Sequence, residues 1–131
     1  MIISIDATNG LAIYDQIVRQ IKFAIASEVL LPGELIPSVR EMAKQTAVNP
    51  NTVSRAYREL QSEGILDVVR GTGLQVTTGA VKQCLKDRQG LIQERLRAVL
   101  KEAQQSQLEV DDIRQLIDSE LARLNGKGTA E

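Results

Sequence analysis

The sequence predicts a mainly α-helical fold with one small β-hairpin, followed by a tail of two helices. Apolar residues recur at helical spacing before residue 31, between residues 38 and 60, and again between residues 81 and 124. Two short β-prone runs, LDVVR and LQVTT, flank the glycine-containing connection 71–73. We therefore predict one domain at residues 1–78 and a second at residues 79–131.

Composition limits the function before any motif is considered. The chain has 131 residues, a net charge of −1 and only 2% aromatic residues, so we expect an aliphatic core. Cys84 is the single cysteine and histidine is absent, which excludes an intrachain disulfide and histidine-based catalysis. We find no paired nucleophile and base, no phosphate-binding loop and no metal-ligand spacing, and therefore predict no catalytic residue, metal or cofactor. Because no signal peptide or transmembrane run is present, we expect a cytoplasmic protein without membrane partners.

The first domain is predicted to begin with one long helix. Residues Ile2, Ile3 and Ile5 are β-prone and form either an ordered arm or a frayed end. A helix is predicted over Tyr14–Leu30, with a core stripe of Ile17, Ile21, Ile25 and Val29. Pro32–Gly33 forms a turn. Leu35–Ile36 is expected to be a very short strand that pairs with the hairpin.

Two short helices are predicted next, joined by a tight turn. Ser38 and Glu41 form a capping box at the start of the first. Asn49 caps the second, and Pro50 suits its first position. On a helical wheel the second helix has one apolar side, made of Val53, Ala56, Tyr57 and Leu60. The opposite side carries Asn51, Arg55 and Arg58, with Thr52 and Ser54 on its flanks.

The polar side has two interpretations. One is an ordinary amphipathic helix with solvated arginines; the other is a helix that reads DNA with short polar groups and arginines. The hairpin favours the second, because a helix-turn-helix followed at once by a hairpin is a winged helix. Residues 40–58 also carry four basic side chains against Glu41 alone. Arg70 is expected at the base of the wing, where it can reach the DNA backbone or minor groove.

The tail is predicted to contain a helix from about Val81 to Gln104, which Gly90 interrupts or bends. A second helix is expected to begin near Ser106 or near Asp111, and Gly126–Glu131 to be a frayed end. Two helices with apolar stripes cannot cover each other fully, so either the winged-helix domain or the same two helices of a second chain must cover them. We favour the second chain, because two-fold dimers are the commonest assembly. The candidate dimerisation residues are Val81, Leu85, Ile92, Leu96, Val99, Ile113, Leu116, Ile117 and Leu121.

Several motifs in register resemble the GntR family of bacterial winged-helix transcription regulators. They are Tyr14-x-Gln16-Ile17, Leu30-x-Pro32-Gly33-Glu34, Pro37-Ser38-x-Arg40, Asn49-Pro50-Asn51-Thr52-Val53, Ala56-Tyr57-x-x-Leu60, and Gly64 through Arg70-Gly71-x-Gly73. The short tail is similar to that of the YtrA subfamily. The resemblance implies a homodimeric repressor of a double-stranded DNA operator, often encoded beside transporter genes.

The resemblance also implies which residues contact DNA. Arg40, Asn49, Asn51 and Thr52 match contact positions of the family, and Gly71 and Gly73 match its wing-tip glycines. The chain departs from the family at Pro50 and Ser54, where arginine is common, and at Glu28, where glycine is usual. Leu74–Gln75 replaces a usual Thr–Phe. The full set of candidate DNA-binding residues is Ser38, Arg40, Asn49, Asn51, Thr52, Ser54, Arg55, Arg58, Arg70, Gly71, Thr72 and Gly73.

Two further points stay open at the level of sequence. Winged helices also serve as protein-docking modules, although such a module has no need for arginines around the second helix. A small-molecule effector is possible, but a two-helix tail offers no dedicated ligand-binding domain. We interpret Cys84 as a core residue rather than a redox sensor.

Overall fold

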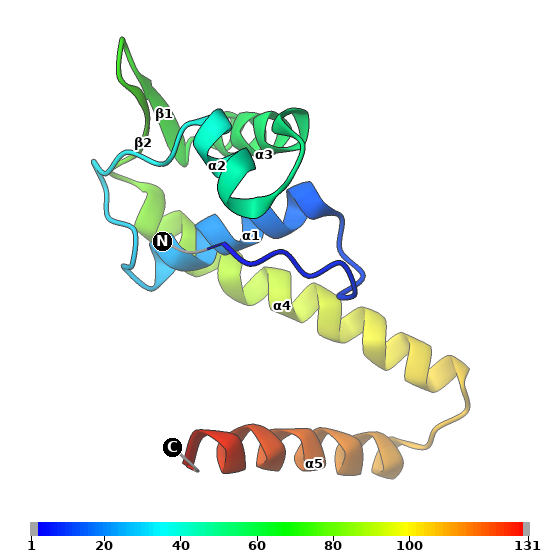
Figure 1. Ribbon diagram of the computed structural model, residues 1–131. Helices are drawn as coiled ribbons and strands as arrows, with labels where there is room; N and C mark the ends of the chain where they lie inside the picture. The colour runs from blue at the N-terminus through cyan, green and yellow to red at the C-terminus, as the bar shows by residue number, and fades with distance from the viewer. Residues whose placement is uncertain (1–2, 130–131) are drawn as a thin grey trace. The chain divides into compact units, whose positions relative to one another are not determined.

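The computed structural model describes residues 3–129 and confirms the predicted fold class (Figure 1). The described elements are α1 (Ile13–Ala26), α2 (Val39–Thr46), α3 (Pro50–Ser62), β1 (Leu66–Val69), β2 (Gly73–Val76), α4 (Ala80–Gln105) and α5 (Val110–Thr129). The chain divides into two compact units, residues 1–90 and 91–131. The first turns of α4 belong to the first unit, so that unit extends past the predicted boundary at residue 78.

The core of the first unit is aliphatic and lies between α1 and α3. Ile17, Ile21 and Ile25 of α1 are completely buried, as predicted. The predicted fourth member of this stripe, Val29, is 62% exposed. The prediction is wrong there because α1 ends at Ala26 and Glu28 takes a left-handed conformation, with φ of 61°, that turns the chain away. Leu30, which follows, is the residue that returns to the core.

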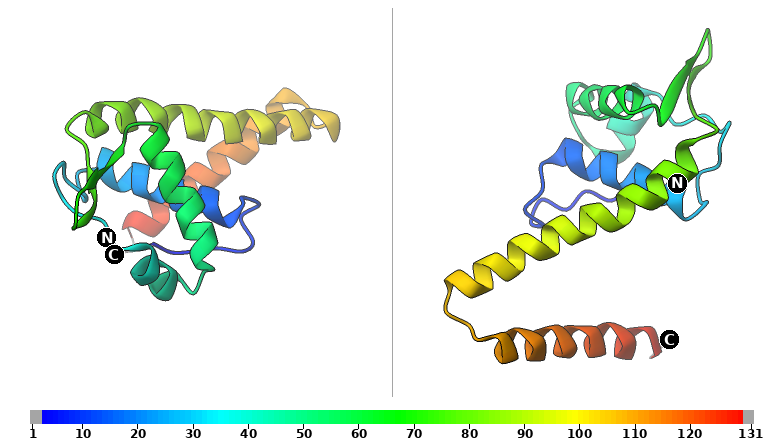
Figure 2. Two further views of the ribbon diagram at one scale, coloured as in Figure 1. Left: turned by 90° about the horizontal axis from the view of Figure 1, so that it is seen from above. Right: turned by 180° about the vertical axis from the view of Figure 1, so that it is seen from behind.

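The wing is an antiparallel hairpin in which Leu66 is opposite Val76. It projects beyond the helices of its unit in the right-hand view of Figure 2. The predicted short strand is confirmed, because Leu35 forms a β-bridge with Gln75 and the Ile36 N–H donates to the Leu74 carbonyl at 3.0 Å. This third segment ties the hairpin to the chain just before α2.

The N-terminal segment from residue 3 is an ordered arm, which resolves one of the open alternatives. The Asp6 N–H donates to Gln16 Oε1 at 2.8 Å, and the Ser4 N–H donates to Gln20 Oε1 at 2.9 Å. Ile3 and Ile5 pack against the core, whereas Ile2 lies outside the described residues. Two glutamine side chains of α1 thus hold the arm without a β-strand.

The beginning of α4 is anchored in the first unit. Ala80 and Cys84 are completely buried. Lys22 Nζ of α1 lies 2.9 Å from Glu63 Oε1, just after α3, and 3.3 Å from Asp87 Oδ2 of α4. Gly90 lies inside α4 and does not interrupt it.

The second unit consists of the later part of α4 and α5. The later of the two predicted starts for α5 is the better one, because α5 begins at Val110 and Asp112 Oδ2 accepts a hydrogen bond from the Glu109 N–H at 3.1 Å. The helix continues to Thr129, so the predicted frayed end does not begin at Gly126. The last two residues of that prediction lie outside the described residues.

Candidate nucleic-acid interface

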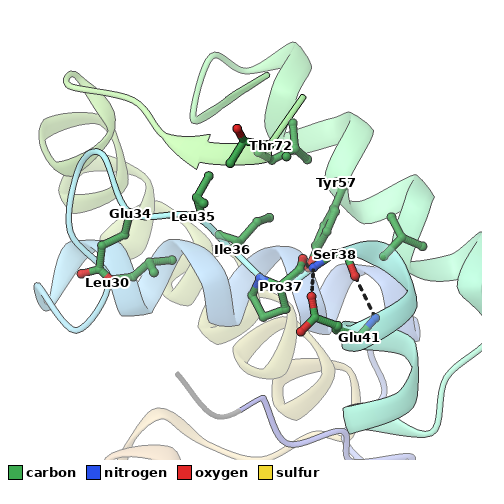
Figure 3. A pocket seen from close by; sticks show the side chains of 12 residues that line it. Leu30, Glu34, Leu35, Ile36, Pro37, Ser38, Glu41, Tyr57 and Thr72 are labelled. Atoms are coloured by element: carbon green, nitrogen blue, oxygen red, sulfur yellow. Dashed lines mark hydrogen bonds between the residues drawn. The ribbon is translucent and has the colours of Figure 1, made fainter. Parts of the chain in front are cut away.

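The two helices of the helix-turn-helix, α2 and α3, are held by capping side chains at their N-termini. Ser38 Oγ accepts a hydrogen bond from the Glu41 N–H at 3.1 Å, and Glu41 Oε1 accepts one from the Ser38 N–H at 3.2 Å (Figure 3). Asn49 Oδ1 accepts from the Asn51 N–H at 2.8 Å. Both predicted start signals are therefore confirmed. Ala47, with φ of 54°, makes the sharp turn between the helices.

The angle between the helices is fixed by a buried tyrosine. The Tyr57 hydroxyl of α3 donates to the Pro37 carbonyl, just before α2, at 2.7 Å. Burial raises the pKa of this phenol, and the negative charge of Glu41 raises it further. Tyr57 therefore stays a neutral donor at physiological pH and holds α3 in place.

The exposed side of α3 has the predicted composition. Asn51, Arg55 and Arg58 are exposed, while Thr52 and Ser54 are half-buried on its flanks. The apolar side, formed by Val53, Ala56, Tyr57 and Leu60, is buried. The helix therefore presents amide and guanidinium groups to solvent, the groups that bind base edges and phosphates.

Four arginines near this surface keep their charge free of carboxylate partners within the described residues. Among residues 3–129, none of Arg40, Arg55, Arg58 and Arg70 forms a salt bridge. Arg19, by contrast, pairs with Asp15 at 3.2 Å. The surface around α3 is thus suited to an anionic partner.

Hollows flank α3 on two sides. A hollow of about 410 Å³ separates it from the wing and is lined by Val39, Asn51, Ser54, Tyr57, Arg58, Gln61 and Leu74. A second, of about 370 Å³, separates it from the start of α1 and is lined by Ile13, Tyr14, Asn51, Thr52 and Arg55. A third, of about 620 Å³, lies between α2 and the wing (Figure 3). The exposed side of α3 is therefore a ridge between recesses.

The tip of the wing is built by a glycine-rich turn. Gly71 and Gly73 have φ of 76° and 144°, values that a residue with a Cβ adopts only at a cost. The Thr72 N–H donates to the Val69 carbonyl at 2.9 Å and closes the turn. Arg70 directly follows β1 and lies at the tip of the wing. The prediction that Arg70 lies at the base of the wing is therefore wrong.

One contact at the interface could not be predicted. The Arg55 guanidinium carbon lies 3.8 Å from the centre of the Tyr14 ring. The sequence indicated only that Tyr14 begins a helix and belongs to a motif shared with the resembled family. The stack depends on how α1 packs against α3, and no local signal reports that packing.

The candidate dimerisation residues are mostly exposed. Leu85, Ile92, Leu96, Val99, Leu116, Ile117 and Leu121 are between 37% and 61% exposed. Ile113 is half-buried, and Val81 is half-buried against the core of the first unit. Among the described helices, none is long and apolar enough to cross a membrane. Over the same residues, no group of three or more potential metal ligands is found.

Cys84 lies in the core, as interpreted from the sequence. Its side chain is completely buried, and burial raises the pKa of the thiol to about 11. The thiolate, which is the form that oxidants attack, is therefore scarce at neutral pH.

The winged-helix geometry agrees with comparisons to known proteins. Residues 13–76 match the family model of bacterial regulatory proteins, gntR family. The HTH-type transcriptional repressor YtrA of Bacillus subtilis is 34% identical over 95% of this chain and 95% of its own length. This chain belongs to the GntR family.

Solved structures of similar proteins have the same fold. YtrA from Sulfolobus acidocaldarius, a GntR-family transcription factor, is 37% identical, with a TM-score of 0.57 over 75% of this chain and 99% of that one. The DNA-binding domain of AraR in complex with operator ORX1 is 28% identical, with a TM-score of 0.53 over 58% of this chain and 96% of that one. The chain is therefore a bacterial GntR-family transcription regulator with a winged-helix DNA-binding domain.

Proposed function

We propose that this regulator is a homodimeric repressor that acts in the cytoplasm and binds a two-fold DNA operator, one belonging to a transporter operon. The observation that carries the proposal is the ridge of α3 between two hollows, with exposed Asn51 and with arginines that pair with no carboxylate of residues 3–129. The repressor YtrA of Bacillus subtilis and the operator complex of AraR support it.

Each part of the interface has a separate role in this proposal. The N-terminal half of α3, with Asn51 and Thr52, enters the major groove and meets base edges. Arg40 and Arg58 contact phosphates and set the register of the protein on DNA. Arg70 and Thr72 of the wing contact the backbone or minor groove beside the same half-site. Asn49 and Ser38 act mainly through the caps that hold the two helix starts.

The proposed dimer uses the exposed apolar side chains of the second unit. Ile92, Leu96 and Leu116 are about half exposed, an uncommon environment for large aliphatic residues in such number. Covering each further 100 Å² of apolar surface contributes about 2.5 kcal/mol before the entropy of association is counted. A symmetric pair of such tails would place two α3 helices on two half-sites.

Selection of bound sequences from a random DNA pool tests the proposal. We expect enrichment of a two-fold sequence whose half-sites are separated by about one helical turn or a small multiple of it. Recovery of only asymmetric sequences, or of none, would contradict the proposal. The absence of any enriched DNA would favour the alternative, a winged helix that docks on protein.

Substitutions then separate the two kinds of DNA contact. Loss of a base contact, as expected for Asn51→Ala, costs about 1–3 kcal/mol and relaxes specificity at one position. Arg40→Ala should weaken binding to all sequences and flatten the dependence of affinity on salt. Arg114→Ala, an exposed arginine of the second unit, is the matched control and should bind as the wild type does.

A further inference from the structure

Arg55 differs from the other interface arginines because an aromatic ring holds it. Its guanidinium carbon lies 3.8 Å from the centre of the Tyr14 ring. At this distance the cation is attracted by the negative face of the ring. The side chain therefore gives up conformational freedom before any partner arrives.

Stacking leaves the hydrogen-bonding groups of Arg55 unused. A guanidinium carries its five N–H donors in its own plane, so a contact through its flat face does not consume them. Within residues 3–129, no carboxylate pairs with Arg55. The group is thus oriented but unpaired with any carboxylate in the described part of the chain, and it lines an open hollow together with Asn51 and Thr52.

The position of the stack indicates a phosphate rather than a base edge. Arg55 follows Asn51 by one helical turn and leans toward α1, on the flank of α3 that faces away from the wing. When a recognition helix lies in the major groove, its flanks face the sugar–phosphate strands that border the groove.

We propose that Tyr14 is a positioning residue for DNA binding, which holds the Arg55 guanidinium against its ring so that the guanidinium meets a phosphate of the bound strand. This inference rests on the proposed function. Tyr14 acts through Arg55, and the start of α1 thereby takes part in binding. The competing explanation is that the stack only stabilises the packing of α1 on α3.

A double-mutant cycle separates the two explanations. The full-length variants are Tyr14→Phe, Tyr14→Leu, Arg55→Ala and the combination of Tyr14→Leu with Arg55→Ala. Their affinities are measured on the selected operator and on unrelated DNA at several salt concentrations, and folding is checked by thermal unfolding. Binding of the wild type to the operator is the prior control, and its failure would refute the proposed function itself.

We expect Arg55→Ala to weaken binding to both DNAs. It should also lower the slope of log affinity against log salt concentration by about one. Tyr14→Leu should weaken binding about two- to fivefold, while Tyr14→Phe, which keeps the ring, binds like the wild type. In the Arg55→Ala background, Tyr14→Leu should cause no further loss.

Two results would overturn the inference while wild-type binding stands. One is full affinity in the Tyr14→Leu variant. The other is an equal loss from Tyr14→Leu with and without Arg55, which identifies a packing role only. If Tyr14→Leu does not fold, Tyr14→Met removes the ring with a more adaptable side chain and is judged by the same two results.

Discussion

Glu28 lies two residues after the end of α1, and its φ is 61°. A left-handed conformation costs a residue with a Cβ about 1–2 kcal/mol, whereas glycine adopts it freely. We predict that Glu28→Gly stabilises the protein by about 0.5–1 kcal/mol, because the relief of strain exceeds the added freedom of the unfolded chain.

Urea unfolding of the two proteins measures this difference. Glu28→Ala is the control, since it removes the charge but keeps the Cβ, and it should gain no stability from relief of strain. A lower midpoint for Glu28→Gly than for the wild type would show that the carboxylate contributes more than the backbone strain costs.

The buried thiol leads to a second prediction at the same scale. Cys84 is completely buried and its pKa is raised to about 11, so thiol reagents should modify the folded protein slowly at neutral pH and rapidly only after unfolding. The rate of labelling with and without denaturant measures this. Oxidant-dependent release from DNA that Cys84→Ser abolishes would show instead that the thiol is a sensor.

At the scale of elements, the ammonium group of Lys22 joins α1 to the end of α3 and to α4. Burial alone would lower the pKa of Lys22, but the hydrogen bonds and charges of Glu63 and Asp87 outweigh burial and raise it. Because the pKa of Lys22 is raised in the folded state, the stabilisation from its ion pairs is complete below about pH 10.5, the ordinary lysine value. It is lost as the pH rises through the raised value.

We therefore predict that Lys22→Met destabilises the first unit by about 1–3 kcal/mol at pH 7, since two partly solvated carboxylates lose their counter-charge. The difference from the wild type should shrink above about pH 10.5. Thermal unfolding at several pH values measures it. Arg123→Met, which breaks the exposed ion pair with Glu120 in α5, is the comparison and should cost less. A difference from the wild type that persists unchanged at high pH would exclude an electrostatic origin.

Features that depend on local sequence could be predicted, whereas contacts between distant elements could not. Both helix starts of the motif were predictable because capping at Ser38 and Asn49 is local chemistry. The exposed side of α3 was predictable from helical period alone. The Arg55–Tyr14 stack and the pairs of Lys22 were not, because they join residues about 40 to 65 positions apart and depend on packing. Val29 was misassigned because periodicity does not show where a helix ends.

At the scale of the whole molecule, the extent of the buried core indicates which fragment should fold alone. Residues 1–90 contain Ala80, Cys84 and Asp87, all of which contact or support the first unit. We predict that this fragment is a folded monomer that binds a half-site weakly, because the tethered second module is lost. A fragment of residues 1–78 lacks those three residues and should be less stable.

Sedimentation of the full chain and of the fragment tests the assignment of the dimer. Leu96→Asp or Leu116→Asp in the full chain should reproduce the monomer, since a buried unpaired carboxylate is strongly disfavoured. Glu94→Asp, a conservative change at an exposed position of α4, serves as control. A fragment 1–90 that remains a dimer would place the interface in the winged helix and refute the assignment to the tail.

The two tyrosines of the interface have a consequence for optical spectroscopy. The chain has no tryptophan, so Tyr14 and Tyr57 supply essentially all of its ultraviolet fluorescence. Both lie in the first unit. Tyr14 stacks on Arg55, and the Tyr57 hydroxyl donates a hydrogen bond to the Pro37 carbonyl. Their emission is thus a built-in signal from the winged helix alone, whereas far-ultraviolet circular dichroism reports every helix. Recording both during one thermal melt separates the unfolding of the two units without any added label.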